Sequence, residues 1–181
     1  MTVPNLITIL RIILVPILII YMINNRPLAS LIIFIIASIS DALDGFIARV
    51  FNQKSTLGAY LDPLADKILL MTAFITLAVL KMIPSWLAVL VISRDVIILL
   101  GVMVLYLTHY SVKIHPSLLS KATTCMQIAT VLVVLSKGYL NIQPIEIYSF
   151  WLAGIFTIAS GLQYIKAGMI ILSKGVNSNF A

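Results

Sequence analysis

Long apolar stretches separated by short polar breaks constrain this chain more than any other feature of its sequence. Six of them can be distinguished, at roughly residues 5–24, 28–50, 59–80, 84–108, 117–137 and 145–172. A hydrocarbon layer of about 30 Å is crossed by about 20 helical residues, so each stretch could span a bilayer. Lipid offers no partner for backbone N–H and C=O groups, and the stretches lack the alternating pattern of barrel strands. We therefore expect helices.

The composition excludes a soluble globular domain. Of the 181 residues, 61% are apolar and 10% are charged, whereas soluble domains carry about 25% charged residues to cover their surface. Disordered chains are poor in apolar residues and are excluded as well. The sequence predicts an all-α, polytopic membrane protein in which six transmembrane helices form a single domain over residues 1–181, embedded in the lipid bilayer.

The basic residues predict the orientation of these helices. Twelve Lys and Arg against six acids give a formal net charge of +6, which in a membrane chain fits the positive-inside bias and an anionic lipid or phosphate substrate. We do not expect nucleic acid as a partner. One side of the predicted helices receives Arg49, Lys54, Lys113, Lys166 and Lys174, and the other receives only Arg26, Lys81 and Lys137. The first side is predicted to be cytoplasmic, with both termini on that side of the plasma membrane.

Four aspartates lie at the end of the second stretch and the start of the third: Asp41, Asp44, Asp62 and Asp66. Their i, i+3 and i, i+4 spacings put each pair on one helix face. Carboxylates inside a bilayer are costly, and four that converge would be driven to protonate unless cations bind between them. Oxygen ligands suit Mg²⁺ or Mn²⁺, and two such ions can stabilise a phosphoryl displacement. The alternative is four interfacial acids paired with Arg49, Lys54 and Lys67.

Small and polar residues between these acids leave room for a phosphate-bearing ligand. Gly45 and Ala48 keep one helix face bare, and Gly58 lies on the stripe that continues to the third and fourth aspartates. Arg49 offers a planar fork of donors suited to phosphate oxygens. Ser55 adds a hydroxyl in the connecting loop.

This segment resembles a family signature. Residues 41–49, DALDGFIAR, followed by Gly58, Asp62 and Asp66, are similar at every defined position to the D-x-x-D-G-x-x-A-R-x8-G-x3-D-x3-D motif of the CDP-alcohol phosphotransferases. The core of that family is six transmembrane helices with the motif on the second and third, so the resemblance extends over the whole chain.

Two further segments resemble the phosphatidylglycerophosphate synthase branch of this family. The run from Asn5 through Thr8 to Arg11 is similar to its N-x-x-T-x-x-R opening. Residues 120–127, SKATTCMQ, resemble its G-K-x-K-T-x-x-Q segment, although Ser occupies the place of Gly and Thr123 that of the second Lys.

The resemblance implies transfer of a phosphatidyl group from CDP-diacylglycerol to the primary hydroxyl of sn-glycerol 3-phosphate, with release of CMP, by a homodimer whose active site lies at the cytoplasmic side. It also implies that the four aspartates hold two divalent ions, Mg²⁺ or Mn²⁺, and that Asp66 is the general base. The residues expected to bind CDP-diacylglycerol are Asn5, Thr8, Gly45, Ala48, Arg49, Ser55 and Gly58.

An acceptor with a phosphate requires a second cationic pocket. Arg94 lies deep in the fourth stretch, and Lys121 lies near the start of the fifth. A charged residue at such a position is unusual unless it binds a ligand. Arg11, about one turn beyond Thr8, is a third candidate. The alternative for Arg94 is an internal ion pair, although the adjacent Asp95 would point to a different helix face.

Two rival functions remain open. The same chemistry could use another acceptor, such as an inositol phosphate, serine or phosphatidylglycerol. An ion-coupled transporter would also hold acids in the membrane, but near its middle and on broken helices.

Several other residues are expected to be structural. Cys125 lies in an apolar run and is expected to be buried. Trp86, Tyr148 and Trp151 are expected to anchor the outer membrane interface, where Glu146 is expected as an interfacial charge.

Overall fold

The computed structural model describes the backbone of residues 3–50, 58–107, 117–137 and 143–178, and side chains within 9–40, 67–103, 117–137 and 144–169. The helices are α1 (Val3–Ile23), α2 (Pro27–Val50), α3 (Gly58–Val79), α4 (Ser85–Leu107), α5 (Leu118–Ser136) and α6 (Gln143–Ser178). These described ranges contain no strand, which confirms the all-α prediction and the number of helices. The predicted bounds are correct to within a few residues, except that α6 continues to Ser178.

The helices expose apolar faces. Along α6 the outward side chains are large and hydrophobic: Ile147, Trp151, Ile155, Ile158 and Leu162. Two segments, Leu118–Ser136 and Pro144–Met169, have the length and apolar character to cross a membrane. Shorter apolar segments lie in α1, α2 and α3. An exterior of this kind is suited to lipid and not to water.

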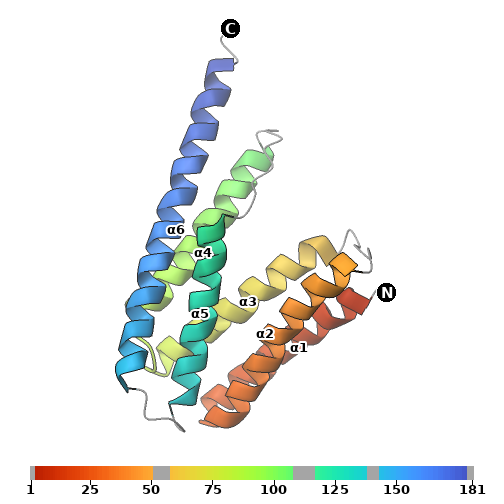
Figure 1. Ribbon diagram of the computed structural model, residues 1–181, viewed down its shortest axis with the longest axis vertical. Coiled ribbons are helices and arrows are strands. Elements are labelled where there is room, and N and C mark those ends of the chain that lie inside the picture. The colour runs from red at the N-terminus through yellow and green to blue at the C-terminus, as the bar shows by residue number, and fades with distance from the viewer. Residues whose placement is uncertain (1–2, 51–57, 108–116, 138–142, 179–181) are drawn as a thin grey trace.

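The helices form two groups, which are joined by α3 and by direct packing of α2 against α5. Figure 1 shows α1 and α2 on one side, α4, α5 and α6 on the other, and α3 running obliquely between them. Accordingly α3 contacts both groups, since it packs against α1 as well as against α4 and α5. The start of α1, the end of α2 and the start of α3 lie at the same end of the molecule (Figure 1). The segments that carry the four aspartates are therefore neighbours.

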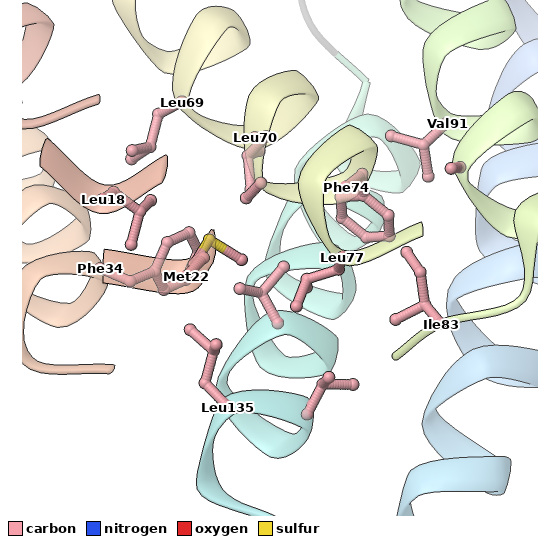
Figure 2. Close-up of a cluster of buried hydrophobic side chains, with 14 of the residues drawn as sticks. Leu18, Met22, Phe34, Leu69, Leu70, Phe74, Leu77, Ile83, Val91 and Leu135 are labelled. Atoms are coloured by element: carbon pink, nitrogen blue, oxygen red, sulfur yellow. The ribbon is translucent and has the colours of Figure 1, made fainter. Parts of the chain in front are cut away.

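The apolar core is organised around α3. Leu70, Phe74 and Leu77 lie three or four residues apart, so they share one helix face, and all are buried. Figure 2 shows Leu70 toward Leu18 and Phe34 of the first group, and Phe74 and Leu77 toward Val91 and Ile83. Lys67 lies on α3 one turn before this buried stripe, at the edge of the core.

Candidate active site

The aspartates lie where the helix ends meet. Asp41 and Asp44 belong to the last three turns of α2, and Asp62 and Asp66 belong to the first three turns of α3. Both segments are helical, so the spacings that put each pair on one face hold in the structure. The side chains of these four residues lie outside those described, so their convergence on metal ions stays a prediction.

The predicted nucleotide-lipid residues lie at the same end of the fold. Asn5 and Thr8 are in the first turns of α1, and Gly58 begins α3. Gly45, Ala48 and Arg49 lie with the first two aspartates in the last turns of α2. Ser55 lies outside the described residues, as do the side chains of the others. The helix ends are brought together as the prediction requires, and the contacts within the site stay predictions.

A second polar cluster is centred on Arg94 of α4, whose side chain is 3% exposed. Its Nη1 donates to Asp95 Oδ1 at 2.6 Å. Its Nη2 donates to Ser120 Oγ of α5 at 2.6 Å and to Ser160 Oγ of α6 at 2.8 Å, and its Nε donates to Ser160 Oγ at 3.3 Å. The guanidinium carbon lies 5.8 Å from the ring centroid of Tyr164, within cation–π range. One arginine thus ties three helices together.

Asp95 adds a fourth helix to this cluster. The side chain is completely buried, and its Oδ1 accepts from Lys67 Nζ of α3 at 2.5 Å as well as from Arg94. Its Oδ2 has no hydrogen-bond partner within the described part of the chain. Lys67 is 26% exposed. Two cations therefore share one carboxylate oxygen, and these three side chains carry a formal charge of +1.

This geometry corrects one expectation and adds one residue. Asp95 was expected to point away from Arg94, but the long arginine side chain reaches its neighbour, so the internal ion pair does form. Lys67 was considered in the sequence only as a counter-charge for the aspartates. A lysine in an apolar helix is a signal for a functional charge, and the sequence contained that signal.

Ser120 and Thr123, the two departures from the branch motif, have structural roles here. Ser120 accepts a hydrogen bond from Arg94, a contact that Gly could not make. Thr123 is buried, and its hydroxyl donates to the carbonyl of Phe156 on α6 at 3.0 Å. The departures thus strengthen the contacts of α5 with α4 and α6.

The other two candidate cations lie apart from this network. Lys121 is exposed in the first turn of α5, next to Ser120. Arg11 is completely buried on α1. In the described residues α1 packs against α2 and α3 but not against α4, α5 or α6. Arg11 therefore lies beside the helices that carry the aspartates and not in the Arg94 cluster.

Other expectations differ from the structure. Cys125 is exposed on α5, so the expectation of a buried thiol was wrong. Glu146 is buried, with 7% of its surface exposed, and its Oε2 lies 2.8 Å from Lys137 Nζ. Glu146 thus belongs to an ion pair, and its position at the outer interface stays a prediction.

The predicted aromatic anchors lie at the starts of α4 and α6, at the end opposite the aspartates (Figure 1). The rings of Trp86 and Trp151 pack at a centroid distance of 5.4 Å. Tyr148 is 69% exposed. Their depth in a membrane stays a prediction.

Known proteins resemble this chain along most of its length. A model of the CDP-alcohol phosphatidyltransferase family matches residues 1–159. A Bacillus subtilis protein named CDP-diacylglycerol--glycerol-3-phosphate 3-phosphatidyltransferase is 36% identical over 183 residues, which cover 89% of this chain and 92% of that protein. A Rickettsia bellii protein of the same name is 34% identical, with 91% and 93% covered. Human cardiolipin synthase (CMP-forming) is 34% identical over 88% of this chain, which spans 58% of that protein.

The family match includes α1 to α5 and about half of α6, together with every residue of the aspartate motif. The predicted resemblance is thereby confirmed, and the chain belongs to the CDP-alcohol phosphatidyltransferase family.

Proposed function

We propose that this chain is an enzyme of phospholipid biosynthesis that transfers the phosphatidyl group of CDP-diacylglycerol to sn-glycerol 3-phosphate. The products are phosphatidylglycerophosphate and CMP. The observation that carries the proposal is the net positive cluster of Lys67, Arg94 and Asp95, which begins one residue after Asp66 on α3. A partly buried excess of positive charge among the described side chains, next to the aspartate motif, suits an acceptor that carries its own phosphate. The relatives in Bacillus and Rickettsia carry the matching name.

Divalent ions, Mg²⁺ or Mn²⁺, fit the chemistry of the donor set. Asp41, Asp44, Asp62 and Asp66 would hold two of them, because carboxylate oxygens are the ligands that hard cations prefer. Among the side chains that the structure describes, no group of three or more His, Cys, Asp or Glu could hold a metal, which directs the proposal to this quartet. When bound, the ions would neutralise the charge that develops on the CMP leaving group.

The reaction is a displacement at the phosphorus that bears the diacylglycerol. Asp66 would accept the proton of the primary hydroxyl while the hydroxyl oxygen forms the new P–O bond and the P–O bond to CMP breaks. The residues proposed to bind and orient the donor's nucleotide and phosphates are Asn5, Thr8, Gly45, Ala48, Arg49, Ser55 and Gly58. Orientation contributes because the two reactants are then held in position to react.

The acceptor phosphate is proposed to bind at Arg94 and Lys121. The hydroxyls of Ser120 and Ser160 fix the plane of the Arg94 guanidinium, which limits the ordering that binding would require. Lys121 follows Ser120 directly and is exposed, so it is accessible to a water-soluble anion. Arg11 is a weaker candidate, because its helix does not contact α4 or α5 within the described residues.

We further propose that all six helices of this single domain cross the plasma membrane, and that both termini and the active site are cytoplasmic. The apolar outward faces and the Lys and Arg bias of the loops support this orientation. The donor's acyl chains would stay in the inner leaflet while its headgroup enters the site from water. A homodimer is proposed from the family resemblance.

The test is turnover of the purified protein in detergent. CDP-diacylglycerol is supplied with glycerol 3-phosphate, an inositol phosphate, serine or phosphatidylglycerol, and CMP and the product lipid are identified by mass spectrometry. We expect glycerol 3-phosphate to be used and EDTA to abolish turnover. Turnover with inositol phosphate or serine, but not with glycerol 3-phosphate, would contradict the assignment.

The role of Asp66 has its own prediction. Asp66→Asn removes the proposed proton acceptor and a metal ligand, so we expect kcat to fall by at least about 100-fold, the lower range of general-base catalysis. The rate of CMP release checks this. A loss below about tenfold would remove Asp66 from the role of base.

Phosphatidylglycerol is the second candidate acceptor, and the similarity to human cardiolipin synthase favours it. The chain spans only 58% of that protein, compared with 92% of the Bacillus protein. The phosphatidylglycerol arm of the same experiment decides between the two.

A further inference from the structure

Two cations in the Arg94 cluster are held unusually close to each other. Lys67 Nζ lies 2.5 Å and Arg94 Nη1 lies 2.6 Å from the same oxygen, Asp95 Oδ1. The two nitrogens are therefore separated by no more than about 5 Å. Without the carboxylate, two like charges at this distance would repel each other strongly in a buried site. Asp95 is thus what allows Lys67 and Arg94 to lie side by side.

The arrangement is not the one that an ion pair built only for stability would adopt. A carboxylate normally receives two donors on its two oxygens, as in bidentate pairs. Here both cations use Oδ1, while the fully buried Oδ2 has no hydrogen-bond partner among the described residues. Leaving Oδ2 without a partner costs free energy, but it brings the two cations closer together than binding to separate oxygens would.

The charge of the cluster is also unbalanced. Among the described side chains one acid faces two cations, and the other contacts of Arg94 are the neutral hydroxyls of Ser120 and Ser160 and the ring of Tyr164. A buried structural ion pair is expected to be neutral, because each uncompensated charge costs free energy. An excess positive charge of this kind is compensated when an anion binds.

Lys67 is the member of the cluster that such an anion can reach. Its side chain is 26% exposed, compared with 3% for Arg94 and none for Asp95. It also follows Asp66, the proposed base, on α3, and consecutive Cα atoms are about 3.8 Å apart. Because Lys67 directly follows Asp66 in α3, an acceptor phosphate at Lys67 would place the acceptor within about one helical turn of the residue proposed as the base.

We propose that Lys67 is a ligand of the acceptor phosphate and that Asp95 is the positioning residue that holds Lys67 beside Arg94. The inference rests on the proposed function and deepens it. It assigns to the site a cation beyond Arg94 and Lys121, and it predicts selectivity for a short alcohol that carries a phosphate monoester.

The experiment compares four variants with the wild-type protein in detergent, with KM measured separately for glycerol 3-phosphate and for CDP-diacylglycerol. Lys67→Met removes the charge and retains the length of the side chain, and Lys67→Arg retains the charge. Asp95→Asn removes the carboxylate, alone and combined with Lys67→Met. The matched control is Lys137→Met, which breaks an ion pair of similar length at the opposite end of the fold.

Loss of a hydrogen bond to a charged group corresponds to roughly a tenfold or larger change in affinity. We therefore expect Lys67→Met to raise the acceptor KM by about 10-fold or more and to leave the KM for CDP-diacylglycerol within about twofold. Lys67→Arg should stay close to wild type, and Lys137→Met should leave both constants unchanged. Asp95→Asn should raise the acceptor KM in the wild-type background and by a smaller factor in the Lys67→Met background, where only its contact with Arg94 remains to be lost.

An unchanged acceptor KM in Lys67→Met would overturn the proposal. A full additional effect of Asp95→Asn in the Lys67→Met background would overturn the positioning role alone. If Asp95→Asn does not fold, the two Lys67 variants decide, since Asp95 keeps Arg94 as its partner in both. If the wild-type protein does not use glycerol 3-phosphate, the proposed function fails first, and that result is separate from any effect of Lys67.

Discussion

The molecule contains two described ion-pair sites at different depths, and they differ in almost every physical respect. The Asp95 site joins four helices, buries Arg94 and Asp95 while Lys67 is partly exposed, and carries an excess positive charge among the described side chains. The Lys137–Glu146 site connects the end of α5 with the start of α6, is electrically neutral, and leaves its lysine 48% exposed. Both rely on contacts of similar length, so the difference lies in burial and in balance of charge.

We interpret this difference as that between an ion pair that only stabilises the fold and one that forms part of a binding site. A neutral pair at a helix end costs little to bury because its lysine keeps contact with water. A charge excess held between helices is costly unless an anion is bound at some stage. We therefore assign anion binding to the Asp95 site. The Lys137–Glu146 pair, in contrast, stabilises the connection between α5 and α6.

The largest expected effect on folding comes from removing the two acids. Asp95→Asn leaves buried Arg94 and partly exposed Lys67 without their counter-charge, and breaking a buried pair such as Arg94–Asp95 costs about 3–5 kcal/mol. Glu146→Gln should cost about 1 kcal/mol or less, because half-exposed Lys137 can turn to water. Denaturant unfolding in mixed micelles gives both values. Equal losses would contradict the distinction between the two sites.

A smaller effect is expected at Ser160. Its hydroxyl accepts from both Nε and Nη2 of Arg94, and both residues are buried. Ser160→Ala removes an acceptor from a charged donor, which costs about 1.5–3 kcal/mol in the free energy of unfolding. Ser149→Ala is a suitable control, because the Ser149 hydroxyl donates only to the carbonyl of Glu146 in its own helix. A loss no larger than that of the control would show that Ser160 does not hold Arg94.

The helices were predicted well from the sequence because a lipid bilayer permits few other backbone structures. Apolar length alone defined the six elements, whereas the extension of α6 to Ser178 was missed because its last turns are more polar. Cys125 was misjudged for a related reason. In a membrane protein the core-facing and lipid-facing sides of a helix are both apolar, so an apolar run does not tell them apart.

The site was predicted in its residue types but not in its connections. Helix geometry fixes the direction of each Cβ, but it does not fix where a long side chain ends, so the internal ion pair of Arg94 was considered only as the alternative. Lys67 meets Asp95 across 28 residues of chain, and that pairing depends on how α3 crosses α4. Ser120, taken as a departure from a motif, has a clear role only once Arg94 is placed.

The smallest expected effect is a difference between the two sites in how salt changes the cost of a mutation to the free energy of unfolding. Lys137→Met should lower the free energy of unfolding by at most about 1 kcal/mol. This loss should be smaller at 1 M salt, where the Debye length is about 3 Å, because ions in water screen a half-exposed pair. The cost of Asp95→Asn should fall by a smaller fraction between low and high salt, because Arg94 is buried and only the partly exposed Lys67 is reached by ions. Unfolding titrations of both variants at the two salt concentrations provide the measurement. If the Asp95→Asn penalty fell with salt by the same fraction as the Lys137→Met penalty, ions would reach Arg94 as well as Lys67, and the charge excess could be compensated by the medium without any bound acceptor.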